Sequence, residues 1–175
     1  MIKTKRLILR RWEDADRGPH AAMNADPTVM KYMRAPLSEA ESNARIDRME
    51  ESFQKNGYGH FAVVLKDTGE FIGSLGLTQV PANLPFAPGV EIGWRIAHPY
   101  WNKGYATEGA LGVVMHAFEE LDIPEIVSFS AKENAASQRV MDKVGMLYDP
   151  QGRFMHPDLP AEHKLAPHVL YRLKR

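Results

Sequence analysis

The stretch Tyr100-Trp101-Asn102-Lys103-Gly104-Tyr105-Ala106-Thr107-Glu108 decides how this sequence is interpreted, because it joins an expected strand to the strongest expected helix. Alternation of apolar and polar residues over Val90–Ile96 predicts the strand. An apolar face at helical spacing over Ala106–Leu121 predicts the helix. Gly104 lets the backbone approach a ligand closely, and the first amides of a helix have no partners within it. With the positive end of the helix dipole, such a turn is suited to binding an anion, although a plain turn before a helix is the alternative.

The elements around this stretch alternate between strand and helix signals. Ser38 and Glu41 form a capping box that predicts a helix ending near Asn56-Gly57, and Asn134 and Gly145 mark the two ends of another. The further expected helices are Asp14–Asn24, broken near Gly18-Pro19, and one that begins at Asp26-Pro27. The further expected strands are Lys5–Trp12, His60–Leu65, Phe71–Val80, Ile126–Ala131, Met146–Phe154 and His168–Leu173. This order predicts a mixed α/β (α+β) fold, a mixed sheet with helices on its faces.

Composition sets the broad class of protein. The 175 residues are 44% hydrophobic and 25% charged, which is ordinary for a globular protein and predicts one domain spanning residues 1–175. No apolar run approaches the roughly 20 residues of a membrane span, and no signal-peptide stretch opens the sequence, so we expect a cytoplasmic protein without a membrane partner. Lys and Arg total 22 and so do Asp and Glu, which disfavours nonspecific nucleic-acid binding. The absence of cysteine excludes disulfides, thiolate metal sites and a cysteine nucleophile.

The sequence resembles the GNAT N-acetyltransferase superfamily, and more narrowly its RimJ/RimL-type branch, whose founding members acetylate the N-termini of ribosomal proteins. The resemblance covers nearly the whole chain, and the order and spacing of its motifs carry it. These motifs are Thr4–Arg10, Glu91–Trp94, Tyr100–Glu108, Glu133–Ser137 and Lys143–Met146. The resemblance implies a twisted sheet of about seven strands flanked by about four helices. It also implies that two central strands splay apart where Ile96 and Phe129 lie, and that the acetyl donor enters that gap.

The resemblance implies a set of residues that bind acetyl-CoA. Backbone amides of the turn would hold the pyrophosphate, here Asn102, Lys103, Gly104, Tyr105, Ala106 and Thr107. The strand end at Ile96 would pair with the pantetheine arm. Asn134 matches the family asparagine that contacts the cofactor, and a plain helix N-cap is the alternative.

The resemblance also implies two catalytic residues. Glu91 matches the usual position of the base that deprotonates the amine, with an exposed residue paired to Arg95 as the alternative. Many members have a tyrosine acid seven residues after the asparagine, but Met141 stands there and cannot donate a proton. Ser137 matches a serine that can approach the sulfur in RimJ/RimL-type sequences, and a small packing residue is the alternative.

The predicted function is therefore direct transfer of an acetyl group from acetyl-CoA to a primary amine in a ternary complex. The acceptor would be a peptide or protein N-terminal α-amine or a small molecule, and the family often forms homodimers. A noncatalytic acyl-CoA-binding sensor is the rival interpretation. His156, His163 and His168 match no zinc pattern, so no metal site is predicted, and they are expected in loops near the substrate cleft.

Overall fold

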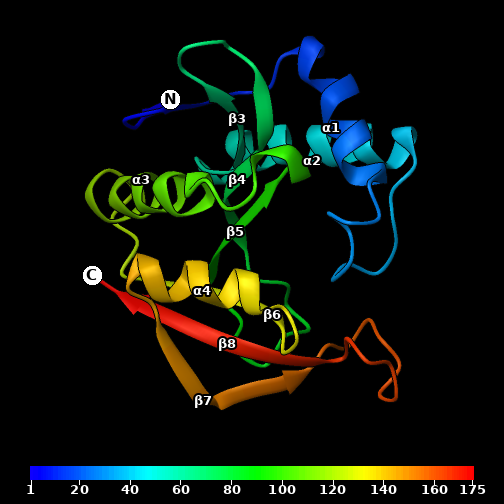
Figure 1. Ribbon diagram of the computed structural model, residues 1–175. Coiled ribbons are helices and arrows are strands. Elements are labelled where there is room, and N and C mark those ends of the chain that lie inside the picture. Colours follow the sequence, from blue (N-terminus) through cyan, green and yellow to red (C-terminus); the bar gives the residue numbers. More distant parts are fainter.

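The computed structural model describes residues 1–175 and shows an eight-stranded mixed sheet with four α-helices (Figure 1). The strands are β1 (Ile2–Lys3), β2 (Leu7–Arg10), β3 (His60–Leu65), β4 (Phe71–Gln79), β5 (Val90–Ile96), β6 (Glu125–Ala131), β7 (Leu147–Met155) and β8 (Pro167–Lys174). The helices are α1 (Arg17–Ala25), α2 (Glu39–Asn56), α3 (Tyr105–Glu119) and α4 (Ala135–Val144), with short 3-10 turns at Asp14–Asp16 and His98–Tyr100. The predicted mixed fold is confirmed, and the additional strand is the two-residue β1.

The sheet is nearly divided between β5 and β6. The strand order is β1-β2-β3-β4-β5-β6-β8-β7, and every neighbouring pair is antiparallel except β5 and β6. Glu91 and Val127 are the only residues of that parallel pair in register. At this junction the hydroxyl of Ser128 donates to the carbonyl of Ile92 at 2.9 Å. Towards Ile96 and Phe129 the two strands have no ladder pairing, so the sheet opens as expected.

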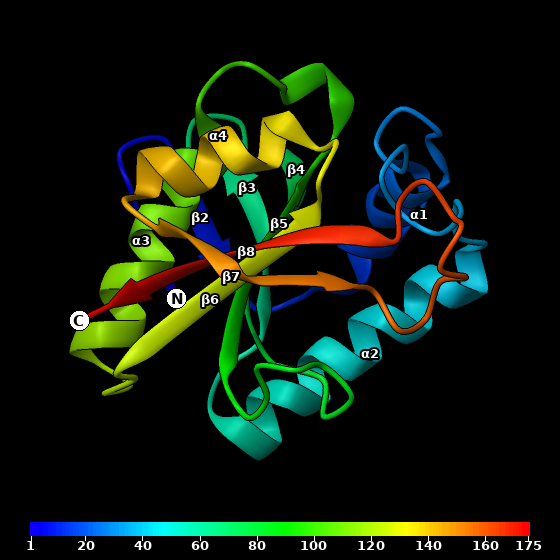
Figure 2. The same ribbon diagram turned by 90° about the horizontal axis from the view of Figure 1, so that it is seen from below.

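The helices cover the two faces of the sheet in pairs (Figure 2). Helices α3 and α4 lie on one face and bury the main hydrophobic core, whereas α1 and α2 pack together over β3 and β4 on the other face. Leu7, Leu75, Ile92, Val113, Ile126 and Met141 are among the core side chains with no exposed surface. Gly109 allows α3 to approach the sheet, because a Cβ at this position would lie 2.9 Å from the Leu75 side chain. The α1 and α2 face carries the buried polar residues described below.

Local capping signals are confirmed where the sequence marked them. The Ser38 hydroxyl accepts a hydrogen bond from the Glu41 amide, and the Glu41 carboxylate accepts one from the Ser38 amide. Gly57 and Gly145 end α2 and α4 in the left-handed conformation, with φ of 79° and 90°. Each cap depends only on residues that are adjacent in the sequence, so the sequence pattern predicts it directly.

Two predictions near the N-terminus are wrong, and a third has shorter bounds than expected. Helix α1 runs through Gly18-Pro19 without a break, because Pro19 lies in the first turn, where its missing N–H has no partner to lose. Asp26-Pro27 begins turns rather than a helix, and the Asp26 carboxylate accepts from the Thr28 amide at 2.7 Å. The strand predicted over Lys5–Trp12 is present as β2, but it is confined to Leu7–Arg10.

Candidate active site

The turn before α3 presents several backbone amides without partners. Gly104 is the N-cap, with φ of 81° and ψ of 4°, and no side chain caps the helix. The first backbone hydrogen bond of the helix runs from the Glu108 amide to the Gly104 carbonyl, at 3.0 Å. The amides of Tyr105, Ala106 and Thr107 therefore lack intrahelical acceptors. Asn102 also has a positive φ, 60°, so left-handed residues flank Lys103 and shape a concave backbone suited to an anion.

The N-terminal segment braces this turn. Glu108 accepts hydrogen bonds from the Thr4 hydroxyl, the Arg6 amide and the Arg6 Nε, each at 2.6 Å. The Arg6 guanidinium lies over the Tyr105 ring, 4.4 Å from its centroid. A Cβ built at Gly104 would be 3.5 Å from an Arg6 Nη, so this cation lies beside the turn.

Helix α4 begins on the same side as α3, since the two helices run alongside each other in the same direction (Figure 1). The Asn134 side chain accepts from the Ser137 amide at 3.1 Å and caps the helix. This N-cap role, one of the two expected, is present. The Ser137 side chain is half-buried in the first turn, whereas Met141 is fully buried in the core. The position of the missing family tyrosine is therefore a packing position in this chain.

Ile96 lies at the open end of β5. The Ala97 amide donates to the Ile72 carbonyl of β4, so the polar groups of Ile96 face away from β4, towards the gap. The Ile96 carbonyl accepts a hydrogen bond from the Trp101 indole at 2.6 Å. The sequence does not predict this contact, which joins the turn to the end of the strand. The Ile96 amide is left facing the gap.

Glu91 lies on the opposite face of β5 from the core residue Ile92, beneath α1 and α2. Its carboxylate makes no ion pair or hydrogen bond, and the predicted alternative of a pair with Arg95 is wrong. A Cβ built at Gly93 would lie 3.8 Å from Glu91 Oε1 and 3.2 Å from His60 Cε1, so this glycine leaves space between the two side chains. Burial raises the pKa of Glu91 to about 8, and the nearby Arg45 charge partly opposes that rise.

Arg95 belongs to a buried polar network instead. Its Nη1 donates to Asn24 Oδ1 at 2.6 Å, and the Asn24 amide donates to the Ser42 hydroxyl at 2.9 Å. Ser42 also lies 2.8 Å from His20 Nδ1, which links α1, α2 and β5. Burial, with the charges of Arg45 and Arg95, lowers the pKa of His20 to about 3, so this histidine is neutral near pH 7.

Arg45 and His60 complete the polar face, and both were missed from the sequence. The Arg45 Nε is buried without a hydrogen-bond partner, and so is the His60 Nδ1. Burial, again with the charges of Arg45 and Arg95, lowers the pKa of His60 to about 3. A signal for Arg45 was present, because it falls three residues after Ser42 and next to Ile46, on the helical stripe that faces the sheet.

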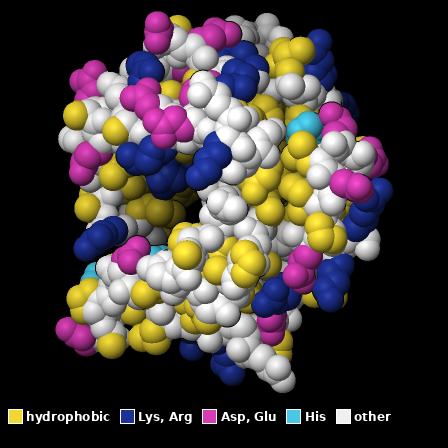
Figure 3. All heavy atoms as spheres, turned by 180° about the vertical axis from the view of Figure 1, so that it is seen from behind, with side chains coloured by type: hydrophobic (Ala, Val, Ile, Leu, Met, Phe, Trp, Pro, Cys, Tyr) yellow, Lys and Arg dark blue, Asp and Glu magenta, His cyan; other side chains and the backbone are white.

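The view from behind shows a hollow on the side where α1 and α2 lie (Figure 3). Lys and Arg side chains gather at its rim and hydrophobic side chains line its depth. The hollow therefore has a basic rim and an apolar floor.

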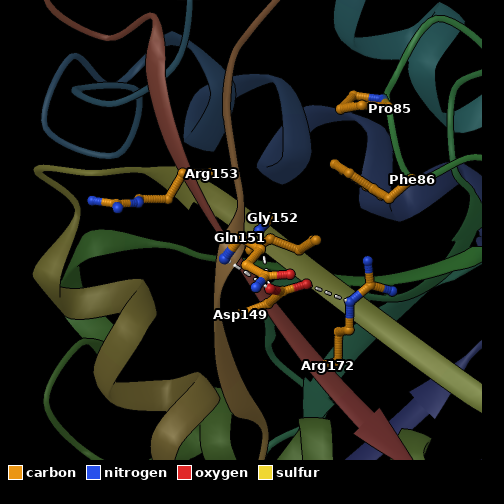
Figure 4. A pocket seen from close by; sticks show the side chains of 8 residues that line it. Pro85, Phe86, Asp149, Gln151, Gly152, Arg153 and Arg172 are labelled. Atoms are coloured by element: carbon orange, nitrogen blue, oxygen red, sulfur yellow. Dashed lines mark hydrogen bonds and ion pairs between the residues drawn. The ribbon is translucent and has the colours of Figure 1, made fainter.

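A second cavity, of about 310 Å³, lies at the β7 and β8 edge and is shown in Figure 4. The Asp149 carboxylate there accepts from Arg172 Nε at 2.8 Å and from the Gln151 and Gly152 amides at 3.0 Å. Because these polar groups are hydrogen-bonded to one another, the cavity presents fewer free polar groups to a ligand than the face that carries Glu91.

The C-terminal histidines pack against aromatic rings. His156 and His168 have ring centroids 4.9 Å apart, and each lies within 6.4 Å of the Phe129 ring on β6. Burial lowers the pKa of His168. No group of three or more His, Cys, Asp or Glu side chains is arranged to hold a metal ion. No helix is long and apolar enough to cross a membrane.

Comparison with known proteins agrees with this geometry. A model of the acetyltransferase (GNAT) domain matches residues 6–147. The Bacillus subtilis protein named uncharacterized N-acetyltransferase YnaD is 31% identical over 146 residues, covering 83% of this chain and 81% of that protein. The crystal structure of a GNAT-family acetyltransferase from Bacillus anthracis superposes with a TM-score of 0.82 at 26% identity, covering 99% and 97% of the two chains.

The chain belongs to the GNAT acetyltransferase family, and it is an enzyme of that class. The noncatalytic rival is therefore set aside. RimL, a ribosomal L7/L12 alpha-N-protein acetyltransferase solved with coenzyme A, has a TM-score of 0.79 at 15% identity, covering 98% of this chain and 95% of that one. At that identity the likeness extends to the fold alone.

Proposed function

We propose that the protein transfers the acetyl group of acetyl-CoA directly to a primary amine, with both substrates bound at once. The observation that carries the catalytic assignment is the unpartnered Glu91 carboxylate on the face opposite the core, level with the start of the gap between β5 and β6. A carboxylate left without a partner at that place is free to take a proton from an incoming amine.

The acid strength of Glu91 suits an α-amine. The α-amine at a peptide N-terminus has a pKa of about 7.7–8.0, close to the value of about 8 for Glu91, whereas a lysine side chain has a pKa near 10.4. Proton transfer is most effective between groups of matched acidity near the working pH. An α-amine therefore demands less of this base than a lysine side chain does.

The turn before α3 fits the pyrophosphate of the co-substrate. The amides of Asn102 through Thr107 surround a concave, uncapped helix start, and Arg6 adds a cation beside Gly104. The Ile96 amide at the gap would pair with the pantetheine arm, and Asn134 would contact the cofactor while it caps α4. Ser137, in the adjoining first turn, would donate the proton that the departing thiolate requires.

Positioning would supply most of the rate. Holding an amine and a thioester together avoids the entropic cost of a bimolecular encounter, and a backbone amide of β5 would stabilise the oxyanion. We place the protein near the RimJ/RimL-type branch on the motifs of its sequence, which favours an N-terminal or small-molecule α-amine as acceptor.

The test is a screen of N-terminal peptides, polyamines, amino acids and aminoglycosides with acetyl-CoA. Thiol release and the mass of the acetylated amine are followed together. We expect amine-dependent thiol release with a matching product. Thiol release that no amine stimulates would contradict the proposal.

A further inference from the structure

The face around Glu91 has more half-buried positive charge than negative. Arg45 from α2 and Arg95 from β5 both lie there, and neither forms an ion pair with a carboxylate. The Arg45 Nε is buried without a partner, and Arg95 donates to the neutral side chain of Asn24. An unpaired charge is costly to bury, so this arrangement favours an anion that enters from outside.

The other ionisable groups do not balance this charge. Asp16 is held by Arg10, whose Nη1 and Nη2 lie 2.7 Å and 3.0 Å from its carboxylate oxygens. His20 and His60 are neutral near pH 7, because burial lowers the pKa of each to about 3. Glu91 is therefore the one carboxyl group left for two guanidinium groups.

One wall of the same face is apolar. Phe129 follows Val127 by two residues on β6, so its side chain lies on the same face of the sheet as that of Val127, the residue in register with Glu91. The rings of Phe86, Phe129 and Phe154 have centroids 5.2 to 5.6 Å apart. Figure 3 shows a hollow on the side of α1 and α2, with basic side chains at its rim and hydrophobic ones below.

We infer that the acceptor is an amino acid with an apolar side chain, whose α-amine faces Glu91 while its carboxylate binds Arg45 and Arg95. This inference rests on the proposed function and narrows its acceptor. The carboxylate supplies the missing counterion, the guanidinium groups match its planar geometry, and the aromatic wall receives the side chain. The Arg45 charge acts on the Glu91 carboxyl group, so the two side chains lie near each other. Their proximity suits a ligand whose amine and carboxylate are separated by few bonds.

The experiment compares matched amines that differ in the carboxylate alone. The pairs are phenylalanine with phenethylamine, leucine with isoamylamine and tryptophan with tryptamine. Phenylalanine amide serves as a neutral isostere and the peptide Phe-Asp-Gly as a protein-like acidic N-terminus. We expect kcat/KM for at least one free amino acid to exceed that of its decarboxylated partner tenfold or more.

Arg45→Gln should abolish this preference, bringing the ratio within each pair to about twofold of unity. Arg48→Gln, an exposed arginine on the same helix, should leave the ratio unchanged. The inference is overturned if the decarboxylated amines react equally well, if the preference survives Arg45→Gln, or if only the acidic peptide reacts.

A binding measurement separates this inference from the proposed function. If no amine is acetylated, the proposed function fails. Calorimetry of phenylalanine and phenethylamine with the enzyme and coenzyme A then decides the inference alone. Tighter binding of phenylalanine that Arg45→Gln removes supports it, and equal or absent binding of the two overturns it.

Discussion

The Arg6 Nε lies 2.6 Å from the Glu108 carboxylate, so a residue of the N-terminal segment is fixed to the first turn of α3 across more than half of the chain. The same carboxylate accepts from the Thr4 hydroxyl and the Arg6 amide. One side chain thus holds the end of a strand against the turn proposed to bind the pyrophosphate.

Replacing Glu108 should loosen this junction. Glu108→Gln should lower the free energy of unfolding by about 1–2 kcal/mol at pH 7, because charge-assisted hydrogen bonds become neutral ones. Burial opposes ionisation of Glu108, but the hydrogen bonds from Thr4 and Arg6 outweigh it and lower its pKa. The stabilisation is therefore present above the unfolded pKa, near 4.5, and is lost as the pH falls through the folded value. Thermal unfolding of wild type and variant from pH 3 to pH 7 measures the difference, with the exposed Glu119→Gln as control. A difference that is constant over this range would contradict the assignment.

Gly104→Val should weaken acetyl-CoA binding at least tenfold, or about 1.4 kcal/mol. A branched side chain at φ of 81° is strained and would stand where the phosphate must approach the backbone. Gly57→Val is a matched control, because Gly57 has φ of 79° and no atom within 4 Å of a built Cβ, but it lies at the far end of α2. Calorimetry should find both variants destabilised and only Gly104→Val impaired in binding. Equal losses of affinity would remove the pyrophosphate role from this turn.

Glu91→Gln should reduce kcat at least about a hundredfold near neutral pH while acetyl-CoA affinity is retained. The wild-type rate should rise with pH up to about 8, since Glu91 must lose its proton before it can accept one from the amine. Among the groups around it, His20 and His60 stay neutral over this range, because burial lowers the pKa of each to about 3. Burial also lowers the pKa of Arg45, and it lowers that of Arg95 to about 9, so the profile is compared below pH 9. The deficit of the variant should shrink as the pH approaches the pKa of the amine. Parallel pH–rate profiles would leave deprotonation to solvent.

The same substitution should stabilise the protein at alkaline pH. The folded pKa of Glu91, about 8, lies above the unfolded value of 4.5, so its favourable contribution is complete below pH 4.5 and is lost as the pH rises through 8. Glu91→Gln, which never ionises, should therefore exceed wild type by about 2–4 kcal/mol at pH 9 and match it at pH 4. Denaturant unfolding at the two pH values measures this, and the exposed Glu51→Gln should show no such trend. An advantage that is independent of pH would mean that Glu91 titrates normally.

Ser137→Ala should lower kcat at least tenfold without changing the affinity for acetyl-CoA, because the thiolate would lose its proton donor. Ser137→Thr keeps a hydroxyl and should recover most of the rate. Steady-state kinetics and calorimetry on the two variants give both quantities. Wild-type turnover in Ser137→Ala would assign the serine to packing.

The parts of the site that the sequence reveals are those set by neighbouring residues. Alternation along β5 places Glu91 opposite Ile92, and the caps at Ser38, Asn134 and Gly145 follow from adjacent residues. The turn around Gly104 belongs to the same group, because its glycine and the helix after it are contiguous.

The remaining features depend on contacts between distant segments. Arg45 approaches Glu91 only when α2 lies on the sheet, and His60 approaches it only when β3, β4 and β5 are assembled, so no spacing in the sequence reports their proximity. A pair between Glu91 and Arg95, four residues apart on the same face of the strand, was the alternative to a catalytic role, but the buried Asn24 of α1 accepts the hydrogen bond of Arg95. Strand β1 is two residues long, which is too short for any periodic pattern to show.

Because β5 and β6 share only one pair of residues in register, the sheet consists of two nearly separate parts. One part contains β1 to β5, and the other contains β6, β8 and β7. Beyond Glu91 and Val127 the facing edges offer backbone groups that the ladder does not use. A peptide-like arm inserted there would complete the hydrogen bonding that the polypeptide leaves unfinished. The incoming co-substrate would then be an architectural component as well as a reactant, and its departure would return the enzyme to an incomplete sheet at the end of every turnover.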